Sequence, residues 1–210
     1  MAKLVTYYRR AGHPQRFWGK RALHKMNSEQ HAQLYRWAME DIELADNSRL
    51  LDIGCGGGAN LNRMLNLNPT FTAVAMDHSQ LAMQMTREVN FHDVVDKRLL
   101  LLCGSASQMP VVRESFELVT AFETIYYWNS LELGVQEMNR VLRPNGIGLI
   151  ANEMDGLEPD VRQFEEAVGN FRVYTIDEIK EHLTEAGFVD IKARHDEARH
   201  FICVTGRKPE

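Results

Sequence analysis

The chain has 210 residues, of which 44% are hydrophobic and 25% are charged. Both fractions are typical of a globular protein, and the length fits a single domain, residues 1–210, better than two. No apolar run approaches the ~20 residues that a membrane span requires, which excludes a transmembrane protein and predicts a soluble one.

Cysteine usage indicates the compartment. The three cysteines, Cys55, Cys103 and Cys203, are an odd number and form no C-x-x-C pair or other metal-ligand spacing. Because free thiols are typical of a reducing environment, we expect all three to be unpaired and the protein to be cytoplasmic.

The formal net charge of −5 is unevenly distributed along the chain. Residues 1–28 contain seven Lys and Arg residues and no Asp or Glu, which leaves 17 basic and 29 acidic residues in the remainder. We expect this basic arm, with the helix that follows it up to residue 45, to fold as a lid over the acidic core of residues 46–210. Because Tyr7, Tyr8, Phe17 and Trp18 are interleaved with the charges, contact with nucleic acid is a second interpretation. An organelle transit peptide is a third, although the arm has a single serine and many aromatic residues.

Helical and strand patterns alternate along the rest of the chain. Leu34, Trp37 and Ile42 follow a helical spacing, and Ser28 is available as an N-cap, so we expect a helix over 29–44. From residue 49 onward, short apolar runs alternate with amphipathic segments. We expect strands at 49–53, 71–76, 99–103, 116–122 and 146–152, with helices at 59–67, 79–90 and 130–142. This alternation predicts an α/β fold in which helices cover both faces of a parallel sheet.

The last third of the chain departs from this alternation. Thr175 and Glu178 form a capping-box pattern, and Gly187 is a suitable helix stop, so we expect a helix over 175–186. Two apolar runs follow at 188–194 and 200–205, joined by a polar turn. These runs predict an antiparallel hairpin in the same sheet.

The most informative motif is Asp52-Ile53-Gly54-Cys55-Gly56-Gly57-Gly58, which ends the first predicted strand. Glycine lacks the Cβ atom that keeps a ligand away from the backbone, and the helix expected to begin near residue 59 points its free N–H groups at the same place. The loop therefore predicts a site for a carboxylate or a phosphate. It fits two cofactor patterns, the dinucleotide pattern G-x-G-x-x-A ending at Ala59 and D-x-G-x-G-x-G starting at Asp52.

A second segment of the sequence favours one of these two cofactor patterns over the other. Residues 137–146, Glu-Met-Asn-Arg-Val-Leu-Arg-Pro-Asn-Gly, resemble the E-x-x-R-V-L-K-P-x-G segment of the class I S-adenosylmethionine (SAM)-dependent methyltransferases, and D-x-G-x-G-x-G resembles their motif I. The Pro-Asn-Gly end of the segment also predicts a turn. From residue 49 to the C-terminus the chain is similar to this family, the type 11 methyltransferases in particular. The resemblance implies a Rossmann-like three-layer sandwich with a mostly parallel seven-stranded sheet that ends in an antiparallel hairpin.

The resemblance also implies a SAM site. Asp52 would orient the loop and the amino group of the cofactor, the loop glycines would admit its methionine part, and Asp77 would bind both ribose hydroxyls because a carboxylate accepts two hydrogen bonds. Asp77 could instead cap the helix expected from residue 79. The implied cofactor residues are Asp52, Gly54, Cys55, Gly56, Gly58, Asp77, His78, Ser105, Ala106 and Phe122.

The segment after the third predicted strand is less regular. Gly-Ser-Ala-Ser-Gln-Met-Pro at 104–110 looks like the G-D-A-x-x-L-P segment that lies beside the adenine in this family, with Ser105 in place of the acid. A hydroxyl can still bond to the adenine edge. An ordinary surface loop is the alternative.

Candidate catalytic residues follow the fourth predicted strand. In an open α/β sheet the ligand crevice lies at the carboxyl ends of the strands, so Glu-Thr-Ile-Tyr-Tyr-Trp at 123–128 should face the methyl acceptor. Glu123 is the candidate general base or amine anchor, and Tyr126 with Tyr127 and Trp128 could form an aromatic cage; packing under the next helix is their alternative role. The loop contains neither the Asn/Asp-Pro-Pro-Tyr/Phe motif for exocyclic amines nor a Pro-Cys nucleophile. We expect residues 153–174 to cover the pocket together with the arm.

Two histidines near the end of the chain raise the question of a metal. His195 and His200 lie on the predicted hairpin, where the sequence offers no third ligand. We therefore expect surface histidines and no metal site.

Together these patterns predict a SAM-dependent methyltransferase with a small-molecule acceptor. One alternative is an RNA methyltransferase whose basic arm, residues 1–28, binds phosphates. Another is a non-catalytic SAM-binding subunit of a larger complex, which the serine at position 105 supports. The sequence carries no signal for an oligomeric state.

Overall fold

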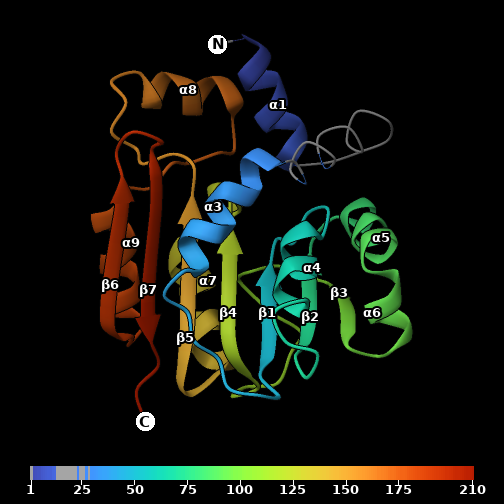
Figure 1. Cartoon of the computed structure of the whole chain (residues 1–210). Coiled ribbons are helices and arrows are strands. Elements are labelled where there is room, and N and C mark those ends of the chain that lie inside the picture. Colours follow the sequence, from blue (N-terminus) through green and yellow to red (C-terminus); the bar gives the residue numbers. More distant parts are fainter. Residues whose placement is uncertain (1, 13–22, 24–26, 28) are drawn as a thin grey trace.

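The computed structural model describes residues 2–12, 23, 27 and 29–210, and within them the chain forms a seven-stranded sheet with the strand order β3-β2-β1-β4-β5-β7-β6 (Figure 1). Strands β1 to β5 are parallel, and β7 runs antiparallel between β5 and β6. The predicted fold class is therefore confirmed. The arm residues Arg16, Phe17, Trp18, Lys20, Arg21 and Lys25, and the Ser28 cap, lie outside the described residues.

The bounds of the elements follow the apolar runs closely. The strands are β1 Arg49–Ile53, β2 Thr72–Asp77, β3 Leu99–Cys103, β4 Phe116–Phe122, β5 Leu142–Asn152, β6 Val189–Asp196 and β7 Phe201–Arg207. In the described part of the chain the helices are α1 Ala2–Gly12, α3 Glu29–Met39, α4 Ala59–Leu65, α5 Gln80–Val89, α6 Phe91–Val95, the 3₁₀ turn η1 Ile125–Tyr127, α7 Leu131–Val141, α8 Val161–Val168 and α9 Ile176–Glu185. The sequence patterns did not predict α1, α6 or α8.

Two predicted boundaries are wrong, for identifiable reasons. Helix α3 ends at Met39 rather than residue 44, because Arg194 Nη1 donates a hydrogen bond of 3.0 Å to the Trp37 carbonyl, which a continuing helix would use. Strand β5 begins directly after α7, at Leu142 rather than 146. The predicted turn lies inside it as an irregularity, with Asn145 at a φ of 65° and a shift of register against β4.

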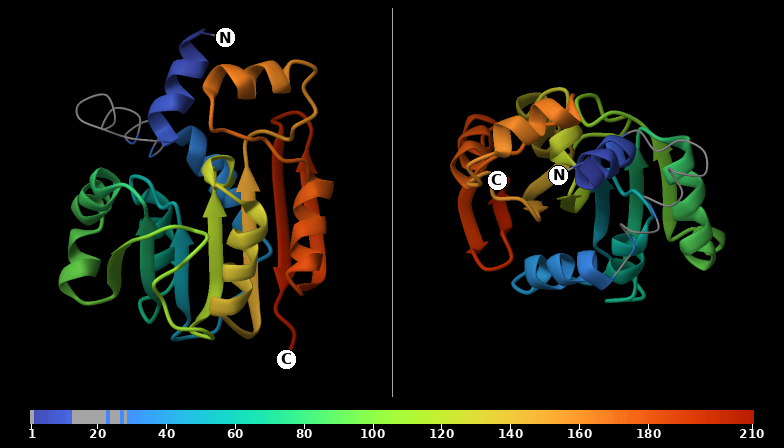
Figure 2. Two further views of the ribbon diagram at one scale, coloured as in Figure 1. Left: turned by 180° about the vertical axis from the view of Figure 1, so that it is seen from behind. Right: turned by 90° about the horizontal axis from the view of Figure 1, so that it is seen from above.

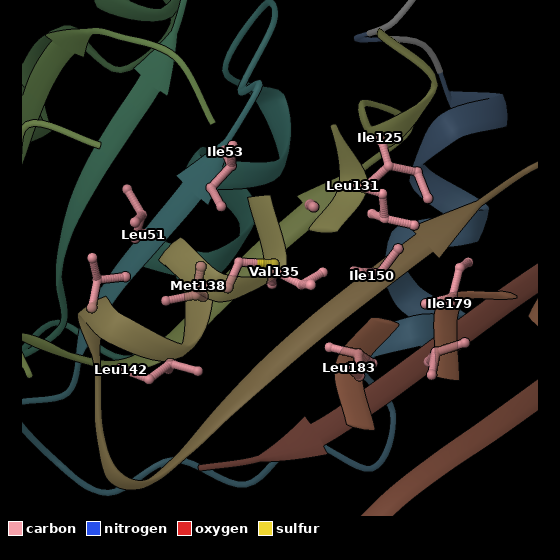
Figure 3. Close-up of a cluster of buried hydrophobic side chains, with 14 of the residues drawn as sticks. Leu51, Ile53, Ile125, Leu131, Val135, Met138, Leu142, Ile150, Ile179 and Leu183 are labelled. Atoms are coloured by element: carbon pink, nitrogen blue, oxygen red, sulfur yellow. The ribbon is translucent and has the colours of Figure 1, made fainter. Parts of the chain in front are cut away.

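Alternate residues of the strands pack on opposite faces of the sheet. On one face Leu51, Ile53 and Ile150 join α7 and α9 in a core cluster (Figure 3). On the other face Leu50 and Leu118 pack against α3 and α4. Figure 1 looks onto the α3 and α4 face, and the left view of Figure 2 looks onto the α7 and α9 face. The result is the three-layer arrangement that an alternating α/β sequence predicts.

The two segments expected to form a cover pack against each other. Val5 and Tyr8 of α1 lie in one apolar cluster with Phe164 of α8 and with Phe171, which follows α8. Both helices lie above the carboxyl ends of the parallel strands (Figures 1 and 2). No helix among the described residues has the length and apolar character to cross a lipid bilayer.

The packing of α7 predicts how substitutions on its two faces affect stability. Met138 is fully buried, so Met138→Ala should lower the free energy of unfolding by about 2 to 5 kcal/mol through lost burial and a cavity. On the same helix Leu133 is 46% exposed, so Leu133→Ala should change the free energy of unfolding by less than about 0.5 kcal/mol. Urea unfolding measures both values, and equal losses would contradict the assigned faces.

Candidate functional site

The glycine loop after β1 is tied to the end of β2. Gly54 N and Cys55 N both donate to the Met76 carbonyl, at 2.7 and 3.1 Å, and Gly56 N donates to Asp77 Oδ2 at 3.1 Å. Gly54 has a φ of 70°, and a Cβ atom there would lie 1.9 Å from Thr124 Oγ1. The position therefore requires glycine both for its conformation and for the close approach of the β4 loop.

Asp77 joins this loop to the start of α5. Its Oδ1 accepts a hydrogen bond of 2.8 Å from Ser79 N, while the Ser79 side chain caps α5 by accepting from Ala82 N. Burial raises the pKa of the Asp77 carboxyl, and the backbone amides of Ser79, Gly56 and His78, together with the charge of His78, oppose that shift. Asp77 thus supports the helix start without being its N-cap.

A cavity of about 290 Å³ opens at the carboxyl ends of β1, β2 and β4. Six of the ten predicted cofactor residues line it: Gly54, Gly56, Asp77, His78, Ser105 and Ala106. Asp52, Cys55 and Phe122 line a second cavity of about 30 Å³, which shares Gly54 and Glu123 with the first. The structure therefore brings nine of the ten residues to one region.

Gly58, the tenth, lines neither cavity. A Cβ atom at Gly58 would lie 2.8 Å from the Thr86 backbone, so this glycine lets α4 pack closely on α5. From α5, Asn90 Nδ2 donates to the Gly58 carbonyl at 3.0 Å, and Thr86 Oγ1 donates to the Gly56 carbonyl at 3.1 Å. The sequence patterns did not single out Thr86 or Asn90, although both are polar residues on an otherwise apolar helix face.

Asp52 is buried at the end of β1 on the α3 and α4 face. Thr120 on the neighbouring strand β4 donates a hydrogen bond of 2.7 Å to Asp52 Oδ1. Burial raises the pKa of this carboxyl to about 7, and the Thr120 hydrogen bond opposes the shift. The charged form of Asp52 is therefore incompletely compensated within the described structure.

Glu123 stands at the junction of the two cavities. Its backbone has a φ of 56°, unusual for a residue with a side chain, and its carboxyl is buried. Oε1 accepts hydrogen bonds from the Tyr126 hydroxyl, at 2.8 Å, and from Glu153 N. Burial, followed by the charge of Glu153, raises the pKa of Glu123 to about 7.

The aromatic residues after Glu123 do not form one cage. Tyr126 is fully buried behind Glu123, stacks on Phe171 and accepts a hydrogen bond of 3.2 Å from Met154 N, so it does not line either cavity. Tyr127 and Trp128 do line the larger cavity. The structure thus places Tyr126 where it holds Glu123, while Tyr127 packs closely on Gly12 of α1 and Trp128 on Gly134 of α7.

Two residues that the sequence patterns missed join Glu123. His31 Nδ1, from α3, lies 2.8 Å from Oε1 of Glu153, which follows β5. One ligand-type atom from each of His31, Glu123 and Glu153 lies within 4.8 Å of the others. No motif links these residues, because they are far apart in the sequence and meet only where α3 crosses the strand ends.

The described part of the arm covers the larger cavity. Ala11 and Gly12 of α1 line it, as does Asn170 from the segment after α8. The Tyr127 hydroxyl donates to the Tyr8 carbonyl at 3.1 Å, and the Arg9 guanidinium donates to the carbonyls of Ala167 and Val168 at the end of α8. Arg9 is therefore committed to a contact within the chain.

His195 and His200 lie beside an acidic residue from another segment of the chain. His195 Nε2 and His200 Nδ1 each lie 3.0 Å from the same oxygen, Oδ2 of Asp155. Glu158 is the fourth member, with its Oε1 3.9 Å from His200 Nδ1. The sequence could not place Asp155 and Glu158 beside the hairpin, because both lie on the segment between β5 and α8.

Known proteins share this fold and its central motifs. Residues 51–150 match the methyltransferase domain family. The 27-O-demethylrifamycin SV methyltransferase of Amycolatopsis mediterranei is 31% identical over 153 residues, which cover 70% of this chain and 56% of that protein. The chain belongs to the SAM-dependent methyltransferase family. A ubiquinone biosynthesis O-methyltransferase of Pseudomonas putida is 26% identical over 62% of this chain and 55% of its own length, so the chain spans about half the length of these two relatives.

A solved methyltransferase-related structure matches nearly the whole fold. A chain from the Haloferax volcanii complex that contains the Trm112 methyltransferase activator superposes with a TM-score of 0.79 at 17% identity, covering 97% of this chain and 98% of that chain. At this identity the match concerns the fold alone. It includes the N-terminal and C-terminal parts that lie outside the matched residues 51–150.

The buried carboxyl of Glu123 predicts that the stability of the folded chain depends on pH. A carboxyl whose pKa is raised on folding stabilises the folded state below its unfolded pKa, near 4.5, and this contribution is lost as the pH rises through about 7. Glu123→Gln keeps the acceptor oxygen and removes the charge. The stability of the variant relative to the wild type should rise by about 2 kcal/mol between pH 5 and pH 8, as measured by urea unfolding. A constant difference over this range would contradict the raised pKa.

Proposed function

We propose that the chain transfers a methyl group from SAM to a small-molecule acceptor. The observation that carries this proposal is the 290 Å³ cavity, in which the glycine loop, Asp77 and Glu123 meet. Its volume is near the lower end of the range for small-molecule sites, about 300 to 1,000 Å³. When bound, SAM supplies an electrophilic sulfonium methyl group.

The described cavity residues fit the charge and shape of this cofactor. Asp52, Asp77 and Glu123 are acidic and buried, which suits the positive sulfonium and amino groups of SAM. The Asp77 carboxylate accepts backbone hydrogen bonds from Gly56, His78 and Ser79, and a carboxylate has further acceptor capacity for a ribose hydroxyl. We place the methionine part against Gly54 and Gly56. The adenine lies beside a group formed by His78, Ser105 and Ala106.

Glu123 is the proposed proton acceptor on the acceptor side of the cavity. A carboxyl with a pKa of about 7 takes up a proton efficiently at neutral pH. The Tyr126 hydroxyl and the Glu153 amide fix the carboxyl, and the His31–Glu153 pair lies beside it. Tyr127 and Trp128 supply apolar walls that hold the acceptor in line, and such alignment can lower a barrier by about 7 to 11 kcal/mol.

An acceptor hydroxyl fits this arrangement best. A hydroxyl oxygen must lose its proton when it is methylated, and Glu123 offers a base for that step. The names of the rifamycin and ubiquinone relatives, which refer to O-methyl groups, support the same class.

We propose that 1–210 is one domain in which the arm acts as a lid rather than as a nucleic-acid contact. Within the described residues, α1 lines the cavity and Arg9 holds α8. An Arg that caps a helix of its own chain is not available to a phosphate. The three cysteines are free, and Cys103 is exposed, which supports a reducing compartment such as the cytoplasm.

Cofactor binding can be tested at Asp77. Asp77→Asn should weaken the binding of S-adenosylhomocysteine by about tenfold or more, since it removes a charged hydrogen-bond acceptor worth ~1.5 kcal/mol or more. Isothermal titration calorimetry measures the affinity. Asp177→Asn, at a side chain that is 94% exposed on α9, is the control and should bind like the wild type. Binding of NAD without binding of SAM would refute the cofactor assignment.

The role of Glu123 requires a separate experiment. Glu123→Gln should reduce methyl transfer to a hydroxyl acceptor by about a hundredfold and remove the rise of activity as the pH increases through about 7, while S-adenosylhomocysteine still binds. Labelled SAM with a panel of phenols and alcohols provides the assay. Cofactor binding without any transfer by the wild type would favour the non-catalytic subunit instead.

A further inference from the structure

A second cluster of potential metal ligands lies outside the proposed methyl-transfer site. It joins the β6–β7 hairpin to the segment between β5 and α8, which meet at one end of the sheet (Figure 1). Asp155 is its centre, with a side chain only 4% exposed, and its Oδ2 lies 3.0 Å from both His195 Nε2 and His200 Nδ1. Glu158 completes the group, since one ligand-type atom from each of Asp155, Glu158 and His200 lies within 4.8 Å of the others.

The spacing of these atoms suits a common metal ion. Neighbouring ligands on a tetrahedral ion with bonds of about 2.0 to 2.2 Å are roughly 3.3 to 3.6 Å apart. The distances from His200 Nδ1 to Asp155 Oδ2, 3.0 Å, and to Glu158 Oε1, 3.9 Å, lie on either side of this range. The other Asp155 oxygen, Oδ1, accepts a hydrogen bond of 3.0 Å from Leu157 N, which fixes the orientation of the carboxylate.

One polar atom of this cluster has no hydrogen-bond partner among the described residues. Glu158 Oε2 is shielded from solvent and has no hydrogen-bond partner within the described structure. Neither Asp155 nor Glu158 forms an ion pair with a described Lys or Arg. A carboxylate oxygen that is shielded from solvent and has no partner is costly, and a divalent cation between Asp155, Glu158 and His200 would compensate it.

We propose that Asp155, Glu158 and His200 bind one divalent transition-metal ion, with Zn²⁺ as the preferred ion, while His195 orients Asp155 through its hydrogen bond. One imidazole with two carboxylates is a donor set that first-row metals of this type accept. The site fastens the hairpin to the segment that leads to α8, and it does not depend on the proposed methyl transfer.

The test uses tag-free full-length protein treated with EDTA and then desalted, in a Cys103→Ser background that removes the exposed thiol. Calorimetric titration with ZnCl₂ compares four chains: the background, His195→Gln/His200→Gln, Glu158→Gln and His182→Gln. Glutamine keeps an N–H donor for Asp155 but is a poor metal ligand, so the double variant separates coordination from hydrogen bonding. His182 on α9, which lies 3.7 Å from Glu185, is a matched histidine next to a carboxylate.

The background and His182→Gln chains should bind one Zn²⁺ each, and the ion should raise their thermal midpoints. The double variant should bind at least about tenfold more weakly, and Glu158→Gln should also be weaker. Co²⁺ should give visible d–d bands with the background but not with the double variant, and circular dichroism verifies the fold of each chain. Absence of a one-to-one site in the background, or unchanged affinity in both ligand variants, would overturn the proposal and leave a hydrogen-bonded clamp.

Discussion

The carboxylate of Asp77 holds together the two loops on which the site is built. It accepts from Gly56 N in the loop after β1 and from Ser79 N at the start of α5, while the Met76 carbonyl accepts from Gly54 N and Cys55 N. These bonds place the glycine loop beside the carboxyl end of β2. The cavity exists because this loop is open and glycine-lined, and the remaining walls attach to it.

The same region contains several buried acidic residues that destabilise the folded state. Asp52, Asp77 and Glu123 all have a raised pKa, in each case chiefly because of burial. A carboxyl of this kind destabilises folding at neutral pH, since the charge loses solvation. Their arrangement makes sense as preorganisation for a positive ligand, whose charge would offset that cost on binding. The stability cost and the proposed cofactor preference thus have one physical origin.

Short sequence patterns predicted those features of the structure that depend on residues close together in the chain. The strands appear where short apolar runs stand, and Asp52 and Asp77 were recognisable because each ends such a run. Contacts between distant segments were not predictable in this way. Arg194 ends α3 from 157 positions away, and His31 meets Glu153 across most of the chain. Such pairs depend on how the layers pack, which periodicity does not encode.

The segment after β5 connects the parts of the site that lie away from the glycine loop. Glu153 donates its amide to Glu123 and pairs with His31, Met154 donates to Tyr126, and Asp155 binds the β6–β7 hairpin. Three consecutive residues thereby connect β4, α3, η1 and the hairpin. None of them belongs to the glycine-loop motif, so the acceptor side can change while the hydrogen bonds of Asp77 stay the same. Helix α8 continues from this segment and packs against α1, whose Ala11 and Gly12 line the cavity, so in the proposed methyl transfer the acceptor side depends on this packing rather than on the cofactor loop.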